Sequence, residues 1–382
     1  MTDRIRQPGL ADLRRRRSEK WRVHPADVLP AFVAEMDFAL AEPIERALLE
    51  AVRLGDTGYA NASGLADAFV AFARDLFGWS PDPANVVIVP DVLIGVAEVI
   101  RVLTKPGDRV VINTPAYPPF WPVVREFSRE IVEAPLARTA DGGWDLDFER
   151  LEAAFASGAA AYLLCNPHNP TGRVFTRAQL EIVADLANRH RVVVVADEIH
   201  APMTLPGAIH TPFVRLGEAG VECSVMVTSA SKAFNLPGLK CAVAVAGSDA
   251  ARQRFADLPD ELHARAGNLG VIASIAAFTE GGPWLRALIA HLDRNRQLLA
   301  GLLERHLPAV GYRPPEASYL AWLDCNALGL GPDPTAVFLE RGRVALSRGL
   351  DFGAEGAGFA RLNIGTSADL MTEAVQRMAA AL

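Results

Sequence analysis

Three side chains that can do chemistry each follow a run of apolar and β-branched residues. They are Asn169, Asp197 and Lys232, after residues 160–165, 192–196 and 225–227. Such runs predict buried strands, so an amide, a carboxylate and an amine are expected at three strand ends. A desolvated lysine loses its proton readily and condenses with aldehydes, whereas a guanidinium stays charged. The pattern therefore predicts a site in which Lys232 forms a Schiff base.

Ligands of an open parallel sheet bind beyond the carboxyl ends of its strands, so these side chains are expected to share one pocket edge. The set suits pyridoxal 5'-phosphate. Lys232 would hold the aldehyde, Asp197 would keep the pyridine nitrogen protonated, and Asn169 would donate to the phenolate oxygen with His200 nearby. Ser229 and the first amides of a helix from residue 92 would hold the phosphate, because helix N-termini offer unpaired donors.

Each of these residues also has an ordinary structural explanation. The Asn-Pro and Thr-Gly pairs around Asn169 are common turn formers, and Asp197 could cap a helix. His200 could be a histidine of the interior and Lys232 a lysine of the surface. Singly, these explanations are at least as good as the catalytic one. Together, the order and spacing of the residues favour the cofactor site.

Strands and helices alternate through the middle of the chain. Seven strands are expected, at residues 86–89, 109–112, 131–134, 160–165, 192–196, 225–227 and 241–245. Helices are expected at residues 43–54, from a Ser63 cap to 77, and at 92–103, 117–127, 147–155, 176–190, 211–218, 250–265, 269–279 and 283–307. Continuous apolar runs separated by helices are typical of a mostly parallel sheet covered on both faces, so the predicted fold class is α/β.

The chain changes character after about residue 307. Short strands at 319–323, 344–346 and 360–364, with helices at 334–341 and 368–382, predict a smaller α+β part. The N-terminal residues 30–38 are apolar but broken by two acids, so an extended segment lying over a site is as good a prediction as a strand.

Length and composition limit the possible functions. With 382 residues, half of them apolar, about two domains are expected. A net charge of -7 with interspersed signs predicts neither a nucleic acid nor a membrane surface as partner, and the four arginines at 14–17 are interpreted as a solvated helix face.

Four scattered cysteines predict buried thiols of a cytoplasmic protein, with no disulfide framework and no metal site. Neither a secretory signal nor a membrane span is expected.

The chain resembles the fold-type I pyridoxal-phosphate enzymes of aminotransferase class I/II. Asn169-Pro170-Thr171-Gly172, Asp197, Ser229-x-x-Lys232 and Arg361 stand in the order of that family. Within it, the chain is most similar to the MalY/PatB group of cystathionine beta-lyases, or C-S lyases. The shared motifs are Lys20-Trp21, FVAEMDF at 32–38, PAYPPF at 115–120, CNPHNP at 165–170, DEIH at 197–200 and FARLNIGT at 359–366.

The resemblance implies roles for further residues. Tyr117 matches the aromatic residue that stacks on the cofactor ring, and Arg361 matches the arginine that clamps the substrate α-carboxylate. Tyr59 matches the tyrosine that reaches the phosphate of the neighbouring subunit, which implies a homodimer with shared active sites. The family architecture also implies a large cofactor-binding domain of residues 41–285 and a small domain of residues 1–40 and 286–382.

Three departures from the family pattern affect the expected contacts. Glu35 stands where the lyase group usually has aspartate, and it is expected to help bind substrate beside Asn169 and Tyr117. Lys240 stands where aminotransferases place a phosphate-binding arginine, so a bidentate fork is replaced by a point charge. Residues 91–95 lack the Ser-Gly-Thr of aspartate aminotransferases, so the backbone of Val92 and Leu93 is expected to contact the phosphate.

The resemblance implies β-elimination from an L-cysteine S-conjugate. Lys232 would remove the Cα proton, the cofactor ring would store the charge, and the β-thiolate would leave, so that pyruvate and ammonia form. An aminotransferase needs the same core residues, and a cofactor-binding regulator or a specialised tailoring enzyme acting on a sulfur-containing amino acid would share them too. The sequence carries no dinucleotide fingerprint, Walker loop, Gly-x-Ser-x-Gly elbow or His-Glu-x-x-His motif.

Overall fold

A seven-stranded sheet forms the centre of the larger part of the molecule. The structure is a computed structural model that describes residues 5–216, 224–259 and 261–382. Along the sheet the order is β2-β10-β9-β8-β7-β3-β4, and only β10 runs antiparallel to its neighbours. The strands are β2 (Val86–Val89), β3 (Arg109–Ile112), β4 (Glu130–Glu133), β7 (Ala159–Cys165), β8 (Val193–Asp197), β9 (Ser224–Thr228) and β10 (Ala242–Ala246). All seven predicted strands are present, each within one residue at either end, and the α/β class is confirmed.

Helices cover both faces of this sheet because alternate side chains of each strand point to opposite faces. Val110 and Ile112 of β3 pack in one core cluster, whereas Val111 packs in another. The first cluster includes residues of α5 (Val92–Leu103), α6 (Phe120–Arg125) and α10 (Asp249–Arg254), and the second those of α7 (Phe148–Ala156) and α8 (Arg177–His190). Strands buried on both faces explain why the sequence shows continuous apolar runs.

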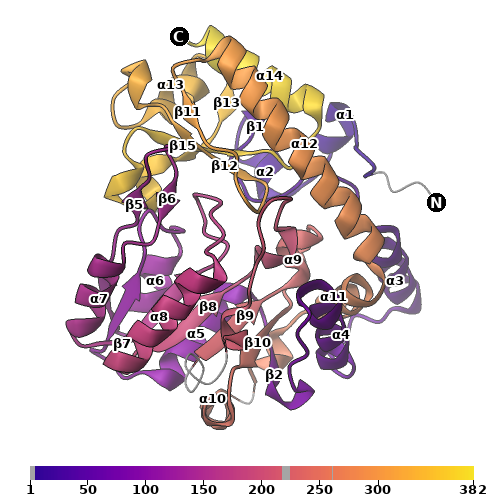
Figure 1. Cartoon of the computed structure of the whole chain (residues 1–382). Helices are drawn as coiled ribbons and strands as arrows, with labels where there is room; N and C mark the ends of the chain where they lie inside the picture. The colour runs from indigo at the N-terminus through magenta and orange to yellow at the C-terminus, as the bar shows by residue number, and fades with distance from the viewer. Residues whose placement is uncertain (1–4, 217–223, 260) are drawn as a thin grey trace.

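A further group of helices packs beside the large sheet and extends to the smaller part of the molecule (Figure 1). α11 (Asn268–Glu280) packs against α3 (Glu42–Leu54) and α4 (Leu65–Phe77). α12 (Gly282–His306) starts beside α11 and runs to the other end of the molecule, where it packs against α14 (Ala368–Ala380) (Figure 1).

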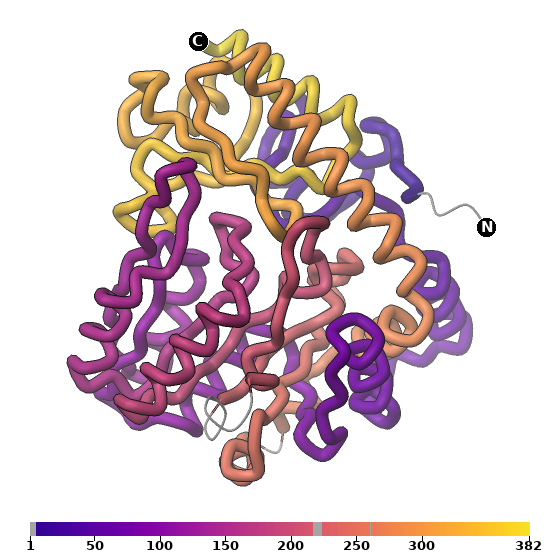
Figure 2. Tube along the Cα trace, in the orientation of Figure 1, coloured from indigo at the N-terminus to yellow at the C-terminus, as the bar shows by residue number. Residues whose placement is uncertain are grey.

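A second, smaller sheet has the order β11-β12-β15-β14. Its strands are β11 (Gly311–Tyr312), β12 (Leu320–Asp324), β15 (Phe359–Asn363) and β14 (Ser347–Arg348), with α13 (Pro334–Glu340) and α14 beside them. The N-terminal helices α1 (Leu10–Leu13) and α2 (Glu19–Arg22) lie with this part (Figure 2). Strand β1 (Leu29–Pro30) pairs in parallel with β13 (Val344–Ala345), and a hairpin of β5 (Ala137–Arg138) and β6 (Trp144–Asp145) faces the smaller sheet (Figure 1).

Four predictions about helices are wrong in detail. The helix predicted at 250–265 ends at Arg254 and continues only as short 3-10 segments, because Pro259 cannot donate an amide hydrogen bond. The helix predicted at 211–218 is a 3-10 turn, Phe213–Arg215, and its last two positions lie outside the described residues. Ser63 does not cap α4, which begins after Gly64 at φ +82° without a side-chain cap. The helix predicted at 117–127 is shortened to α6, since two prolines precede Phe120.

Residues 31–38 form an extended segment, here called the strap, that is held by side chains along its length. Asn363 donates to the carbonyl oxygens of Val33 and Glu35, both at 2.7 Å. Asn235 accepts from the amide of Met36 at 2.8 Å and donates to its carbonyl at 2.9 Å. The strap therefore joins the smaller sheet to the helical turn that carries Lys232. Of the two possibilities that the sequence left open, the extended segment is the one observed.

A buried ion pair anchors the end of the strap. Lys20 Nζ lies 2.8 Å from Asp37 Oδ2, with 1% and 4% of the two side chains exposed, and Trp21 Nε1 donates to the other carboxylate oxygen. We expect Lys20→Met to lower the free energy of unfolding by about 3–5 kcal/mol, because the Asp37 charge would stay buried without its cation. Urea denaturation measures this loss. The exposed Lys105→Met is the matched control, and an equal, small effect of both substitutions would contradict the prediction.

Among the described helices, none combines the length and the apolar character that crossing a bilayer requires.

Candidate active site

The three side chains singled out at strand ends do line one cavity. Asn169 follows β7, Asp197 ends β8, and Lys232 lies in the single helical turn α9 (Ala230–Ala233) after β9. Strands β7, β8 and β9 are adjacent and parallel, so their carboxyl ends meet at the same edge. The cavity has a volume of about 180 Å³, and its other lining residues are Ala34, Asp91, Val92, Leu93, Tyr117, Cys165, Ile199, His200, Ser231, Pro237, Lys240 and Cys241.

The surroundings of Lys232 favour the neutral form of its amine. Burial, followed by the positive charge of Arg361, lowers the pKa of Lys232 to about 8, although the carboxylates of Asp197 and Glu35 act in the opposite direction. The only hydrogen bond of its Nζ within the described residues is to the carbonyl oxygen of Ala34, at 3.0 Å. A buried ammonium is poorly stabilised by this one acceptor, so more of the Lys232 amine is unprotonated near neutral pH than in an exposed lysine.

Asp197 is a buried carboxyl group that lacks a close cationic partner. Its Oδ1 accepts from the amide of Ile199 at 3.1 Å. Burial raises the pKa of Asp197 to about 7, against the amide and the more distant Lys232, which lower it. A buried carboxyl group with a raised pKa becomes a stable anion when a cation binds beside it. A protonated pyridine nitrogen is such a cation.

Arg361 of β15 lies behind the lining residue Asn169 and is hydrogen-bonded to it. Its Nη1 donates to Asn169 Oδ1 at 3.0 Å, and its Nη2 to the Phe32 carbonyl at 3.2 Å and to Ser347 Oγ at 3.1 Å. The guanidinium lies 4.9 Å from the ring centre of Phe352. Burial lowers the pKa of Arg361 to about 10, which still leaves it charged, and its Nε is buried without a partner. A buried guanidinium with an unpaired Nε–H can receive a carboxylate.

We expect Arg361→Lys to raise KM for the amino acid by about 10- to 100-fold, because an ammonium cannot replace the bidentate fork at the same position. Steady-state kinetics at several substrate concentrations measure this change. The exposed Arg177→Lys is the control and should change nothing. A KM that is unaltered by Arg361→Lys would mean that another cation binds the carboxylate.

The first turn of α5 forms the end of the cavity that suits a phosphate. Asp91 caps the helix by accepting from the amide of Ile94 at 2.9 Å, so the cap does not use the amides of Val92 and Leu93. Lys240 Nζ lies 2.9 Å from Asp91 Oδ2 and reaches the same end. Free amides at a helix N-terminus together with an ammonium are an anion-binding arrangement.

His200 and Tyr117 complete the predicted lining. His200 Nδ1 lies 3.0 Å from Ser318 Oγ. Burial, and then the charges of Lys232 and Arg361, lower the pKa of His200 to about 3, so the imidazole is neutral. Tyr117 packs edge-on against Phe120 at 5.7 Å between ring centres, and burial raises the pKa of its phenol. Both groups can therefore act as neutral hydrogen-bonding partners.

Four predicted site residues do not line the cavity. Ser229 Oγ donates to the Cys241 carbonyl at 2.6 Å and accepts from the Ser231 amide. Glu35 accepts from Ser18 Oγ at 2.6 Å, and its charge still acts on Lys232. Arg361 reaches the site through Asn169, and Tyr59 is 92% exposed. Their roles toward cofactor or substrate stay predictions.

The lining residues that were not predicted from the sequence are Ala34, Asp91, Cys165, Ile199, Ser231, Pro237 and Cys241. Ser231 could have been suspected, since it lies two residues after Ser229 in the same turn. Ala34 carries no side-chain signal because it acts through its carbonyl oxygen.

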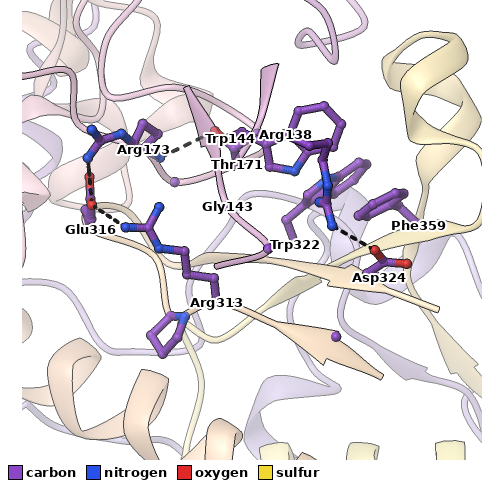
Figure 3. A pocket seen from close by; sticks show the side chains of 14 residues that line it. Arg138, Gly143, Trp144, Thr171, Arg173, Arg313, Glu316, Trp322, Asp324 and Phe359 are labelled. Carbon is purple, nitrogen blue, oxygen red and sulfur yellow. Dashed lines mark hydrogen bonds and ion pairs between the residues drawn. The ribbon is translucent and has the colours of Figure 1, made fainter. Parts of the chain in front are cut away.

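A second hollow lies between the β5–β6 hairpin and the smaller sheet, and Thr171 and Arg173 also line it (Figure 3). It contains three arginines, but each is paired. Arg138 binds Asp324 at 3.0 Å, and Arg173 and Arg313 bind Glu316 at 2.8 and 3.4 Å. Its volume of about 30 Å³ accommodates only a water or two. No group of three or more metal-ligating side chains occurs among the residues that the structure describes.

The cavity around Lys232 fits pyridoxal 5'-phosphate on each of its functional groups. Lys232, an amine of lowered pKa, would hold the aldehyde, and Asp197, a buried carboxyl group, would stabilise the charged ring nitrogen. The first amides of α5 and the ammonium of Lys240 would hold the phosphate. A fold of this kind with such a site defines a lysine-anchored pyridoxal-phosphate enzyme.

Comparisons with known proteins place the chain more narrowly. Residues 35–378 match the family model of aminotransferase class I and II, and the chain belongs to this family. It is 36% identical over 360 residues to the cystathionine beta-lyase PatB of Bacillus subtilis, which covers 93% of each protein. It is 34% identical to the cystathionine beta-lyase of Corynebacterium glutamicum, over 99% of this chain and 100% of that one.

A solved structure supports the same placement. Cystalysin from Treponema denticola, crystallised with pyridoxal 5'-phosphate, superposes with a TM-score of 0.89 at 26% identity over 96% of both chains. The cofactor of this chain is therefore pyridoxal 5'-phosphate, as the sequence predicted.

Proposed function

We propose that the chain is a pyridoxal-phosphate-dependent C-S β-lyase that converts an L-cysteine S-conjugate and water into a thiol, pyruvate and ammonia. The observation that carries this function is that Lys232, Asp197 and Asn169 line one cavity, with Arg361 bonded to Asn169. The chain is also 36% and 34% identical to two cystathionine beta-lyases over nearly its full length. Enzyme class and cofactor follow from the same comparisons.

The bound cofactor supplies an aldehyde for the substrate amine and a ring that accepts the electron pair of the broken Cα–H bond. Arg361 binds the substrate carboxylate and thereby fixes which Cα bond faces Lys232. The Lys232 amine then takes the Cα proton as a general base. Asp197, as an anion, would stabilise the protonated form of the ring nitrogen. The Cβ–S bond breaks and the thiolate leaves with a proton, while water releases pyruvate and ammonia from the remaining fragment.

A direct assay separates this function from its main competitor. We expect the purified protein with cystathionine or an S-alkyl cysteine to form pyruvate in the absence of any 2-oxo acid. Turnover that requires an added 2-oxo acid, without release of a thiol, would instead show an aminotransferase. Bound cofactor without either reaction on a panel of sulfur-containing amino acids would favour a specialised tailoring enzyme.

We further propose the contacts and assembly that complete the site. Val92, Leu93, Ser229 and Lys240 would hold the phosphate, and Tyr59 would reach the phosphate of a second copy in a homodimer. The nearly full exposure of Tyr59 supports this role, because a tyrosine so exposed is free to contact a partner subunit. Glu35 would contact the substrate side chain, which its charge effect on Lys232 supports.

We also propose a large domain of residues 41–285 and a small domain of residues 1–40 and 286–382. The parallel pairing of β1 with β13 supports the grouping of the N-terminal residues with the C-terminal part. A cytoplasmic location is supported by Cys165, Cys241 and Cys325, which are buried free thiols.

A further inference from the structure

The Ala34 carbonyl oxygen accepts two hydrogen bonds at the centre of the active site. One comes from Lys232 Nζ at 3.0 Å, and the other from the hydroxyl of Tyr319, also at 3.0 Å. A carbonyl oxygen has two lone pairs, so these two donors use its full capacity. Ala34 itself lines the cavity, whereas Tyr319 is fully buried behind it.

The backbone around Tyr319 is shaped to aim its hydroxyl at this point. Ser318 has a positive φ of +74°, a left-handed conformation that is uncommon for serine. Its amide donates to the Met203 carbonyl at 3.0 Å, and its Oγ lies 3.0 Å from Nδ1 of His200 in the cavity wall. The backbone amide and the side chain of Ser318 thus both hold it in this strained conformation. Such conformations are typical of residues that position a functional group.

The strap fixes the carbonyl from the other side. The carbonyl oxygens before and after it, on Val33 and Glu35, both bind Asn363, and the next amide binds Asn235. The Ala34 oxygen therefore cannot turn away from Lys232 without the loss of several hydrogen bonds.

We propose that the Ala34 carbonyl, held by the Tyr319 hydroxyl, is the acceptor that receives and orients the Lys232 amine whenever that amine is not bonded to the cofactor. This inference rests on the proposed function, in which the lysine must leave and rejoin the cofactor in each turnover. An amine that donates one N–H to a fixed carbonyl keeps its lone pair in a defined direction, as a base for the Cα proton requires. Tyr319 is thus a positioning residue.

Charged and neutral groups surround the Lys232 amine, and Tyr319 donates the second hydrogen bond to the carbonyl that the amine contacts. The cations that face Lys232 are Arg361 and Lys240, and the anions are Asp197 and Glu35. The neutral polar groups in the wall are Asn169, Ser231, His200, Tyr117, Cys165 and Cys241. Burial raises the pKa of Tyr319, so its hydroxyl keeps its proton and remains a donor across the working pH range.

The test compares Tyr319→Phe with Tyr312→Phe in the full chain. Tyr312 is a partly buried tyrosine that does not line the cavity. Like that of Tyr319, its hydroxyl donates to a backbone carbonyl, here of Arg296 at 3.3 Å. The first readout is the pH dependence of acetylation of Lys232 by acetic anhydride in the cofactor-free protein, followed by peptide mass spectrometry, with the exposed Lys105 as internal reference. The second readout is the split between kcat and KM for pyruvate release.

We expect the acetylation midpoint of Lys232 in Tyr319→Phe to rise by about half a pH unit, because the charged amine gains the second lone pair of the carbonyl. We expect kcat to fall by about tenfold with KM within about twofold, since substrate binding does not involve the phenol. Tyr312→Phe should leave both readouts unchanged.

A midpoint and a kcat in Tyr319→Phe equal to those of Tyr312→Phe would overturn the proposal. If Tyr319→Phe does not fold, a Lys232 acetylation midpoint in the unaltered protein equal to that of Lys105 would overturn the proposal, because an amine held at the buried Ala34 carbonyl cannot titrate like an exposed one. Absence of lyase activity in the unaltered protein would refute the proposed function, but the acetylation readout would still report on the contact between Tyr319, Ala34 and Lys232.

Discussion

Lys232→Ala should lower kcat for pyruvate release by about 10³-fold or more. Two losses combine in this variant. The substitution removes the amine that we propose anchors the cofactor aldehyde. It also removes the proposed general base, and such a base alone contributes about 10²- to 10⁴-fold in enzymes. The fold should persist, because Lys232 makes one hydrogen bond and lines a cavity. Stopped assays over hours, with thermal unfolding measured in parallel, quantify both statements.

Two further variants make this result specific. Lys232→Arg keeps a positive charge but cannot form the imine, so it should be as inactive as the alanine variant. Lys105→Ala removes an exposed lysine and should be fully active. If Lys232→Arg retained a tenth of the activity or more, a covalent role for this side chain would be ruled out.

Asp197→Asn should lower kcat by about 10²- to 10³-fold, because an amide cannot stabilise a protonated pyridine nitrogen in a buried site. The volume of the side chain is unchanged, and the hydrogen bond from the Ile199 amide can still be accepted. Without the charged ring, the electron pair of the Cα–H bond has a weaker acceptor. Cofactor content, measured after alkaline release, distinguishes a slower reaction from loss of cofactor.

The control for this variant is Asp185→Asn on the exposed face of α8, which should behave as the unaltered protein. An Asp197→Asn protein that is fully loaded and fully active would show that the carboxyl group does not serve the ring. Partial loading with normal activity per bound cofactor would contradict the prediction in the same way.

The sheet and its reactive edge were predictable because both follow from local sequence. Each strand of the large sheet is a continuous apolar run, and the residue types change abruptly at Asn169, Asp197 and Lys232. In a parallel sheet, such changes fall on the same edge, so the sequence order alone brings the three groups together.

The strap and the Tyr319 contact could not be predicted in this way. Ala34, Asn235, Tyr319 and Asn363 come from four distant parts of the chain, and their bonds involve backbone carbonyl groups that have no sequence signature. Similarly, Ser63 has the right chemistry for a helix cap, but the left-handed Gly64 takes that position. At the strap and at the start of α4, contacts between distant parts of the chain and the backbone conformation decide the structure, and local sequence propensity does not.

Borohydride reduction of the purified protein, followed by proteolysis and mass spectrometry, gives the most direct test of the covalent chemistry. We expect a single modified lysine, at position 232, with the added mass of a pyridoxyl phosphate group. Modification of Lys240 or of no lysine at all, in protein that carries the cofactor, would contradict the assignment of Lys232 as the residue that binds the aldehyde.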